Sequence, residues 1–345
     1  MLTFIWIAAG TVGGTAVLWI ACSRLEASTH RLAEHYGIPE MVKGSVLMAV
    51  ASSMPELAVA LLAFPVHKDF ELGMSAIIGS AIYNILVIPA FSVYAAGKPI
   101  KANRDLIYRE AQFYLVSVAA IMVVLSLSVI YFGGVETLDS GRRLFHGEFT
   151  RLLALIPILL YGLYLFMQLQ EVKSARHVTP RREGINALKE WTVLVGMVAV
   201  ILVGVEMLLR STLLLADTLH TPTFLWGMTV VAAATSLPDT FLSVKSSRLG
   251  RTDASLSNVF GSNVFDLLVA VPAAVLVAGA LTVNFSQIVP MMTFLVIATI
   301  ALLTFMLRDL ELKRSEAHAM LALYVVFGAW MALEAFGVTH LLALG

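Results

Sequence analysis

The sequence predicts an all-α polytopic membrane protein in which about ten transmembrane helices form two inverted five-helix repeats. The first observation is composition: 59% of the 345 residues are hydrophobic and only 13% are charged, whereas soluble chains carry about 25% charged residues. The second is a series of apolar stretches of membrane-spanning length. The third is a pair of similar segments in the two halves of the chain.

The composition also excludes several classes of function. The formal net charge is zero, so no basic excess indicates a nucleic-acid partner. The single cysteine, Cys22, can form neither an intrachain disulfide nor a cysteine-based metal site. The histidines form no HExxH pattern, and no serine–histidine pairing is present. We therefore expect neither an enzyme nor a bound cofactor.

About ten stretches are long and apolar enough to cross a bilayer, which takes about 20 residues of α-helix. In chain order they are 2–22, 44–64, 72–95, 108–131, 152–169, 191–210, 222–244, 255–279, 285–307 and 317–342. The first is not predicted to be a signal peptide, because no basic residue precedes it and Arg24 follows it.

Basic residues are distributed unevenly between the loops, and this asymmetry sets the expected orientation. Of the 23 lysines and arginines, 18 lie at loops that follow odd-numbered stretches, such as Lys98 and Lys101. Few lie on the other side, such as Lys68. We therefore expect a multi-pass protein of the plasma (inner) membrane with both termini outside the cytoplasm. The segment 170–190 is then a cytoplasmic linker.

Two segments of the first half recur in the second half. GSVLMAVASSMPELAVALLA from Gly44 resembles GMTVVAAATSLPDTFLSVKS from Gly227, and IIGSAIYNILVIP from Ile77 resembles VFGSNVFDLLVAVP from Val259. Five spans, an odd number, separate equivalent points, so the second copy enters the membrane with the opposite orientation. The expected repeats are 1–169, with its repeated segments at 44–95, and 191–345, with its repeated segments at 227–279.

Each copy of the first segment places a proline and an acid inside an apolar stretch: Pro55 with Glu56, and Pro238 with Asp239. Proline in a helix frees the carbonyl four residues earlier, which at membrane depth is tolerated only beside protein or a wet cavity. Acids within a membrane are by default candidates for a functional site. The alternative is a kink with a structural hydrogen-bonding acid, and the recurrence of both residues in the inverted copy disfavours it.

Hydroxyl and amide groups accompany the acids at helical spacing. Ser52 lies four residues before Glu56, and Thr235 lies four residues before Asp239, so each pair shares one helix face. The neighbouring segments repeat this spacing with Ser80 and Asn84, and with Ser262 and Asp266. Four helix faces thus offer hydroxyl, amide, carboxylate and backbone oxygens, a set that suits hard cations such as Ca²⁺ or Na⁺.

These repeated segments resemble the alpha-repeats of the cation/calcium exchanger superfamily, in particular its sodium/calcium exchanger branch, over essentially the whole chain. The resemblance implies a fold in which the second, third, seventh and eighth helices form a core, past which the long first and sixth helices slide. It also implies that Glu56 and Asp239 are the principal Ca²⁺ ligands. By motif position, the Na⁺ and Ca²⁺ sites further include Ser52, Ser53, Ser80, Asn84, Thr235, Ser236, Ser262, Asp266 and the carbonyls of Ala49 and Ala232.

The implied function is secondary active antiport of Ca²⁺ against Na⁺ across the bilayer by alternating access, carried out by a monomer or a loose oligomer. The alternative is a proton-coupled or other divalent-cation antiporter on the same fold; members of that type tend to carry a Gly-Asn and acid pattern that this sequence lacks. GSAIYN and GSNVFD resemble the potassium-dependent branch, so Asp266 is either protonated or accompanied by K⁺. Glu206 and Glu334 are expected to have structural or gating roles.

Overall fold

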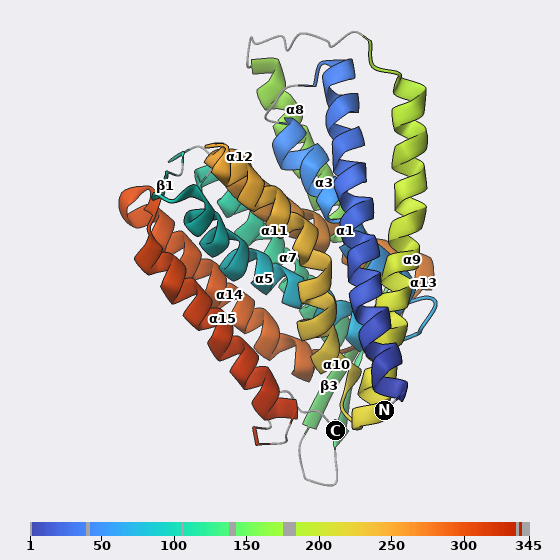
Figure 1. The fold of residues 1–345 in the computed structure, drawn as a ribbon. Helices are drawn as coiled ribbons and strands as arrows, with labels where there is room; N and C mark the ends of the chain where they lie inside the picture. The colour runs from blue at the N-terminus through green and yellow to red at the C-terminus, as the bar shows by residue number, and fades with distance from the viewer. Residues whose placement is uncertain are drawn as a thin grey trace.

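The computed structural model describes residues 2–38, 42–101, 103–104, 107–137, 143–174, 184–335 and 338–339. It confirms an all-α membrane fold built from long apolar helices (Figure 1). The helices of the first half are α1 (Leu2–Tyr36), η1 (Lys43–Met48), α3 (Ala49–Ser52), α4 (Met54–Ala63), α5 (Phe70–Ala96), η2 (Ile107–Ala111), α7 (Gln112–Phe132) and α8 (Arg151–Ser174). Those of the second half are α9 (Ala187–Leu219), α10 (Thr223–Trp226), η3 (Gly227–Val231), α11 (Ala232–Arg248), α12 (Thr252–Phe265), η4 (Asp266–Ala270), α13 (Val271–Ala278), α14 (Phe285–Asp309) and α15 (Arg314–Ala335).

The described helices agree with about ten spans. Eight are individually long and apolar enough to cross a membrane, and a bent pair that contains α3 and α4 makes a ninth. The tenth expected span, 222–244, corresponds to α10, η3 and α11 in succession. The predicted ends of 2–22 and 191–210 were wrong, because α1 continues for several polar turns to Tyr36, and α9 begins at Ala187 and continues to Leu219.

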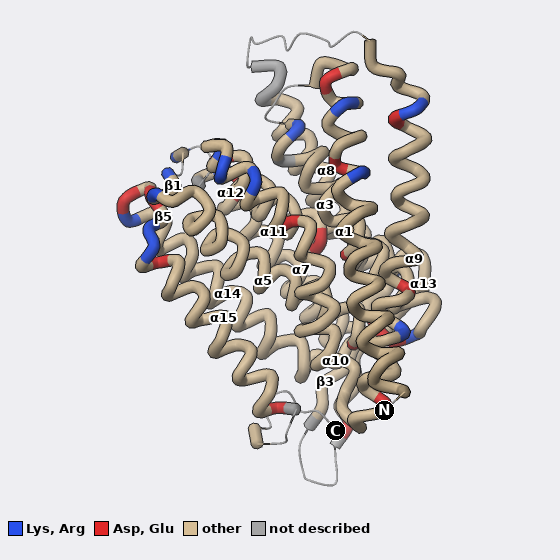
Figure 2. Tube along the Cα trace, viewed as in Figure 1, with Lys and Arg blue, Asp and Glu red and all other residues tan. Residues whose placement is uncertain are grey.

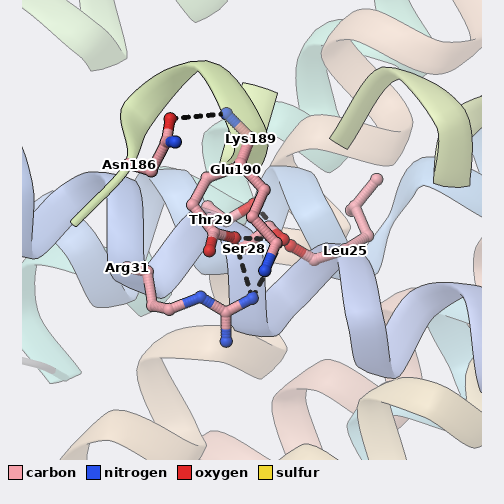
Figure 3. Close-up of polar contacts among 7 residues, drawn as sticks. All are labelled: Leu25, Ser28, Thr29, Arg31, Asn186, Lys189 and Glu190. Carbon is pink, nitrogen blue, oxygen red and sulfur yellow. Dashed lines mark hydrogen bonds and ion pairs between the residues drawn. The ribbon is translucent and has the colours of Figure 1, made fainter. Parts of the chain in front are cut away.

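The two long helices α1 and α9 lie side by side and run in opposite directions (Figure 1). Glycines let their backbones approach: a Cβ added at Gly14 would lie 2.9 Å from the carbonyl oxygen of Gly204. Near one end of the pair, Glu190 of α9 accepts hydrogen bonds from Ser28 and Arg31 of α1, each 2.8 Å long (Figure 3). The first helices of the two halves therefore form one antiparallel pair, the arrangement that an inverted repeat requires.

In the part of the chain that the structure describes, two short β-ribbons join the halves at opposite ends of the molecule (Figure 1). β1 (Ile100–Lys101) pairs antiparallel with β5 (Glu311–Leu312), whereas β3 (Arg143–Phe149) pairs with both β2 (Gly133–Thr137) and β4 (Leu281–Asn284). In each ribbon, a strand that follows the third span of one half meets a strand that follows the fourth span of the other. The all-α prediction did not include these strands, because they are short and lie between spans.

The most enclosed spans lie in the middle of the bundle. In the apolar 18-residue window of α5, 94% of the residues are buried, and in that of the span of α12 and α13 83% are, compared with 22% in α1. α5 contacts α11, α12 and α15. The core therefore surrounds the two helices that carry the second repeated segment of each half.

Lysines and arginines gather at the end of the molecule where α1 ends and α9 begins and beside β1 and β5, whereas few lie at the end that carries the first residues of α1 (Figure 2). This is the asymmetry from which the orientation was predicted. Residues 175–183 of the expected linker lie outside the described residues. The side on which the termini lie and the division into repeats at 169 and 191 stay predictions.

Candidate functional site

Both copies of the proline–acid segment begin with a π-helical stretch, η1 before α3 and η3 before α11, a feature that is frequent at functional sites. The copies then differ. In the first, Ser53 (φ −86°, ψ 7°) interrupts the helix, and the flanking helices meet at a bend of 47°. In the second, α11 continues through Pro238. Glu56 therefore lies in the first turn of α4, whereas Asp239 lies within α11.

Glu56 is buried where α4 meets α5 and α11. The hydroxyl of Ser80 donates a 3.0 Å hydrogen bond to Glu56 Oε1. Because a hydroxyl has one proton, the 2.7 Å contact between Ser80 and Ser236 is then donated by Ser236. Glu56 Oε2 is buried and has no hydrogen-bond partner among the described residues, so one carboxylate oxygen is held and the other is open.

Asp239 has a similar environment, built by the other half. Its Oδ1 accepts hydrogen bonds from the hydroxyl of Ser262, at 3.4 Å, and from the amide of Asn258, at 3.1 Å. Ser52 of the first half lies 3.2 Å from the Ser262 hydroxyl and 3.4 Å from Asn258 Oδ1. In the part of the chain that the structure describes, Asp239 Oδ2 is buried without a hydrogen-bond partner. Each acid thus keeps one open oxygen.

Asn84 and Asp266, which align in the two copies, are both fully buried but have different partners. Asn84 donates from Nδ2 to Asn263 Oδ1 at 3.0 Å, and Asn263 donates in turn to the carbonyl of Ala81 at 3.2 Å. Within the described ranges, neither carboxylate oxygen of Asp266 has a hydrogen-bond partner. The π-helical stretch η4 begins at Asp266, so this acid also marks a local change of helix geometry.

The other predicted ligands lie beside these groups. The Ser53 hydroxyl donates to the carbonyl of Ser262 at 3.4 Å, and the Thr235 hydroxyl donates to the carbonyl of Ala232 at 3.3 Å. The carbonyl of Ala49 accepts the Ser53 amide at 3.0 Å. The Ala49 carbonyl also accepts the Ser52 hydroxyl at 3.2 Å. Both predicted carbonyl ligands therefore already accept hydrogen bonds, which an ion would have to share or replace.

None of the predicted residues is more than 1% exposed, and the contacts above bring them into one region where the two halves meet. No three His, Cys, Asp or Glu side chains of the described ranges converge on one metal position. A hard cation bound here would need hydroxyl, amide or carbonyl oxygens in addition to carboxylates. Asp266 adds a further acid within the electrostatic field of Glu56 and Asp239.

Two asparagines of this region were missed in the sequence. Asn258 binds one of the paired acids, and Asn263 binds the amide of the first half. Both lie on α12 and align with alanines, Ala76 and Ala81. A search for residues that the two copies share passes over them. A difference between the copies would have found them, namely an amide side chain in an apolar span at a position where the other copy has alanine.

A family model described as sodium/calcium exchanger protein matches residues 6–170 and 189–333. The chain belongs to this family. The matched ranges cover most of the chain and leave out residues 171–188, which fall within the expected linker. The proline–acid segments and the asparagines of α12 therefore lie in the parts of the chain that define membership of the sodium/calcium exchanger family.

Three relatives illustrate the range of this family. Inner membrane protein YrbG of Escherichia coli (strain K12) is 26% identical over 263 residues, which cover 74% of this chain and 75% of that protein. Sodium/calcium exchanger MaX1 of Methanosarcina acetivorans is 25% identical over 332 residues, covering 87% and 91%. Sodium/potassium/calcium exchanger 5 of Homo sapiens is 22% identical over 335 residues, covering 69% and 63%.

Solved structures of the sodium–calcium exchanger NCX_Mj share the fold. One, soaked with Na⁺ and Sr²⁺, superposes with a TM-score of 0.63 at 22% identity and covers 94% of this chain and 98% of that one. The structure soaked without Na⁺ and Ca²⁺ gives a TM-score of 0.59 at 21% identity. The likeness to both extends over nearly the whole chain, so the helices that carry the candidate site belong to the shared fold.

Proposed function

We propose that this family member is a secondary active antiporter that exchanges Ca²⁺ for Na⁺ by alternating access. One observation carries the proposal. Glu56 and Asp239 come from different halves. In each, one carboxylate oxygen accepts a hydrogen bond from a serine hydroxyl. The other oxygen is buried and has no hydrogen-bond partner among the described residues. Unpaired buried carboxylates are costly unless a cation or a proton accompanies them, so a buried pair of this kind is suited to a doubly charged cation.

The proposed ligand set is built around these two acids. Two carboxylates balance the charge of Ca²⁺, which takes about 6–8 oxygen ligands. We propose that the rest of the Ca²⁺ and Na⁺ ligands come from Ser52, Ser53, Ser80, Asn84, Thr235, Ser236, Ser262, Asp266 and the carbonyls of Ala49 and Ala232. Na⁺ prefers the same oxygen ligands, so the two ions compete for one region. Competition for a shared site favours exchange over co-transport.

Alternating access is supported by the way α1 and α9 are attached. They form one pair, joined through Glu190 and Arg31, and α1 is much less enclosed than α5. We propose that the pair moves as a unit against the core and opens the site to one side of the membrane at a time. Glycines at the crossing of α1 and α9 keep the two helices close during this movement.

The proposed setting is the plasma (inner) membrane, with the termini outside and the linker 170–190 in the cytoplasm. The basic residues gathered at the linker end support this orientation, and a relative carries the name inner membrane protein. The repeats 1–169 and 191–345 are proposed as the two functional halves. We propose a monomer or loose oligomer that transports ions and needs no cofactor, nucleic acid or catalytic group.

Transport into proteoliposomes tests this function. Vesicles loaded with Na⁺ and diluted into Na⁺-free medium should take up radioactive Ca²⁺, and dissipating the Na⁺ gradient should stop the uptake. A pH gradient of equal size, without Na⁺, should drive none. Uptake driven by the pH gradient alone would instead establish the proton-coupled alternative. Empty liposomes and vesicles carrying Glu56→Gln serve as controls for leakage.

A further inference from the structure

A groove between α1 and α11 leads toward Asp239 from the end of the molecule at which Lys and Arg gather. It consists of two cavities of about 310 and 440 Å³ whose shared lining residues are Ser23, Glu26, Leu242 and Lys245. The inner cavity reaches Pro238, next to Asp239, and the outer one reaches Met48, next to Ala49, and Glu34 near the end of α1. Each cavity has room for several water molecules.

Glu26 is the acid that lines both cavities. Its Oε1 is buried and has no hydrogen-bond partner among the described residues. Lys245, which is exposed on the facing wall, acts on Glu26 through its electric field. A carboxylate with a buried oxygen in a membrane protein is costly unless it is protonated or paired with a cation. Glu26 therefore lines a groove that has room for water, and one of its carboxylate oxygens is not held by a hydrogen-bond donor of the described residues.

Glu26 is also close to the paired acids. Cys22 lies one helical turn before it, is fully buried, and stands in the electrostatic field of Glu26, Glu56 and Asp239 alike. Glu26 itself lies in the field of Asp239. The acid in the groove and the acids of the proposed transport site are thus neighbours, and Cys22 lies near all three.

We propose that Glu26 is a cation-binding residue of the access path, which binds Na⁺ or Ca²⁺ in the groove before the ion reaches Glu56 and Asp239. The inference rests on the proposed function for the direction of ion movement. An acid in a narrow cleft raises the local concentration of cations, and Lys245 opposes this effect. Because Glu26 belongs to α1, movement of the α1–α9 pair would dismantle this site as the groove closes.

The proposed Glu26 site has no counterpart at the aligned position of the second half. In the second half, the residue that aligns with Glu26 is Leu209, which is fully buried in the apolar core. The equivalent position on α9 therefore offers no carboxylate to an ion that arrives from the other face. We call the side of the membrane that carries the linker 170–190 the linker face. Loss of Glu26 should accordingly affect ion binding at the linker face alone. Damage to the helix as a whole would instead affect transport from both faces.

Flux from the two faces tests this asymmetry. In vesicles of defined orientation, Glu26→Gln should raise the apparent KM for Ca²⁺ at the linker face about tenfold and leave KM at the other face unchanged. Lys245→Gln should lower KM at the linker face, because it removes a competing cation. Asp253→Asn is the matched control, since it removes an exposed acid in the first turn of α12 that lines neither cavity, and it should change neither value.

A binding measurement keeps the inference independent of transport. Trp19 lines the inner cavity together with Glu26, so Tb³⁺ bound there should show tryptophan-sensitised luminescence in detergent-solubilised protein. Trp19→Phe and Glu26→Gln should each remove that luminescence, whereas Glu26→Asp should retain part of it. The double variant Glu56→Gln, Asp239→Asn should retain it as well. This readout still tests Glu26 if the wild type shows no Na⁺-driven Ca²⁺ flux, which would overturn the proposed function alone.

Three results would overturn the role of Glu26. They are an unchanged KM at the linker face, an equal rise at both faces, and sensitised luminescence that survives Glu26→Gln. A variant that elutes as aggregate in size-exclusion chromatography is replaced by Glu26→Asp. For that variant we expect an intermediate KM at the linker face, and wild-type values at both faces would contradict the proposal.

Discussion

The hydroxyls of Ser80 and Ser236 lie 2.7 Å apart, although one belongs to each half of the chain. Ser80 also donates to Glu56, so the first acid is tied to the second half through two serines. On the other side, Ser262 donates to Asp239 and lies 3.2 Å from Ser52. Each acid is therefore oriented by a serine of its own half that contacts a serine of the other half.

This relationship predicts the effect of Ser80→Ala. The variant removes the donor to Glu56 and the acceptor of Ser236, and a lost hydrogen bond to a charged group is worth about 1.5–3 kcal/mol. We expect the KM for Ca²⁺ to rise at least tenfold. Ser75→Ala is the matched control, because Ser75 is also buried on α5 but, among the described residues, donates only to the carbonyl of Leu72. Equal kinetics for the two variants would contradict the role of Ser80.

Neutralising either paired acid should nearly abolish Ca²⁺ transport. Glu56→Gln and Asp239→Asn keep an oxygen ligand but remove one of the two charges that balance Ca²⁺ in a low-dielectric region. Both variants should fold, since the amide can still accept the serine hydroxyl. Ca²⁺ flux in proteoliposomes is the measurement, and Glu148→Gln on the exposed part of β3 is the control. Robust exchange by either variant would place the site elsewhere.

Asp266→Asn separates the two states proposed for this acid. If Asp266 is protonated, the amide mimics it, and Na⁺-driven Ca²⁺ flux should persist without K⁺ before and after the substitution. If K⁺ accompanies Asp266, the wild type should need K⁺ and the variant should not. We expect the first result, because Asp266 is fully buried and lies in the electrostatic field of Glu56 and Asp239, which disfavours its charged form. A strict K⁺ requirement that the substitution removes would establish the second.

The contact between His67 and Glu206 should stabilise the conformation described here. His67, between α4 and α5, lies 2.8 Å from Glu206 of α9, so the contact ties the proposed moving pair to the core. Loss of the contact should destabilise this conformation by about 1 kcal/mol. The equilibrium between this conformation and the alternative one then shifts about fivefold. Glu206→Gln should then slow the labelling of a cysteine at Ser23, in the groove, by up to this factor when Cys22 is replaced by alanine. Faster labelling would contradict the assignment.

The orientation can be tested with cysteines at the two ends of the molecule. In a variant that lacks Cys22, an impermeant thiol reagent applied outside intact cells should label Val135→Cys on β2 and should not label Lys101→Cys on β1. Both positions are exposed, so burial does not limit the reaction. Labelling at residue 101 and protection at residue 135 would reverse the predicted topology.

Several features were determined by the sequence alone. Apolar stretches of about 20 residues require helices in a bilayer, because every backbone polar group must be satisfied within its own segment. The recurrence of Pro55–Glu56 as Pro238–Asp239 across an odd number of spans predicted antiparallel halves, and α1 and α9 run antiparallel (Figure 1). The oxygen-rich residues at helical spacing were predicted to share one region, and the structure brings them together.

Tertiary structure alone decided which groups meet across the halves. Asn258 and Asn263 became part of the site through contacts between α12 and the first half, and a comparison of the two copies offers alanines at these positions. Glu26 was expected in a loop, yet α1 continues to Tyr36 and places this acid in the groove beside α11. The physical reason is that spacing along a helix sets which face a side chain occupies, whereas only the packing of helices sets what that face meets.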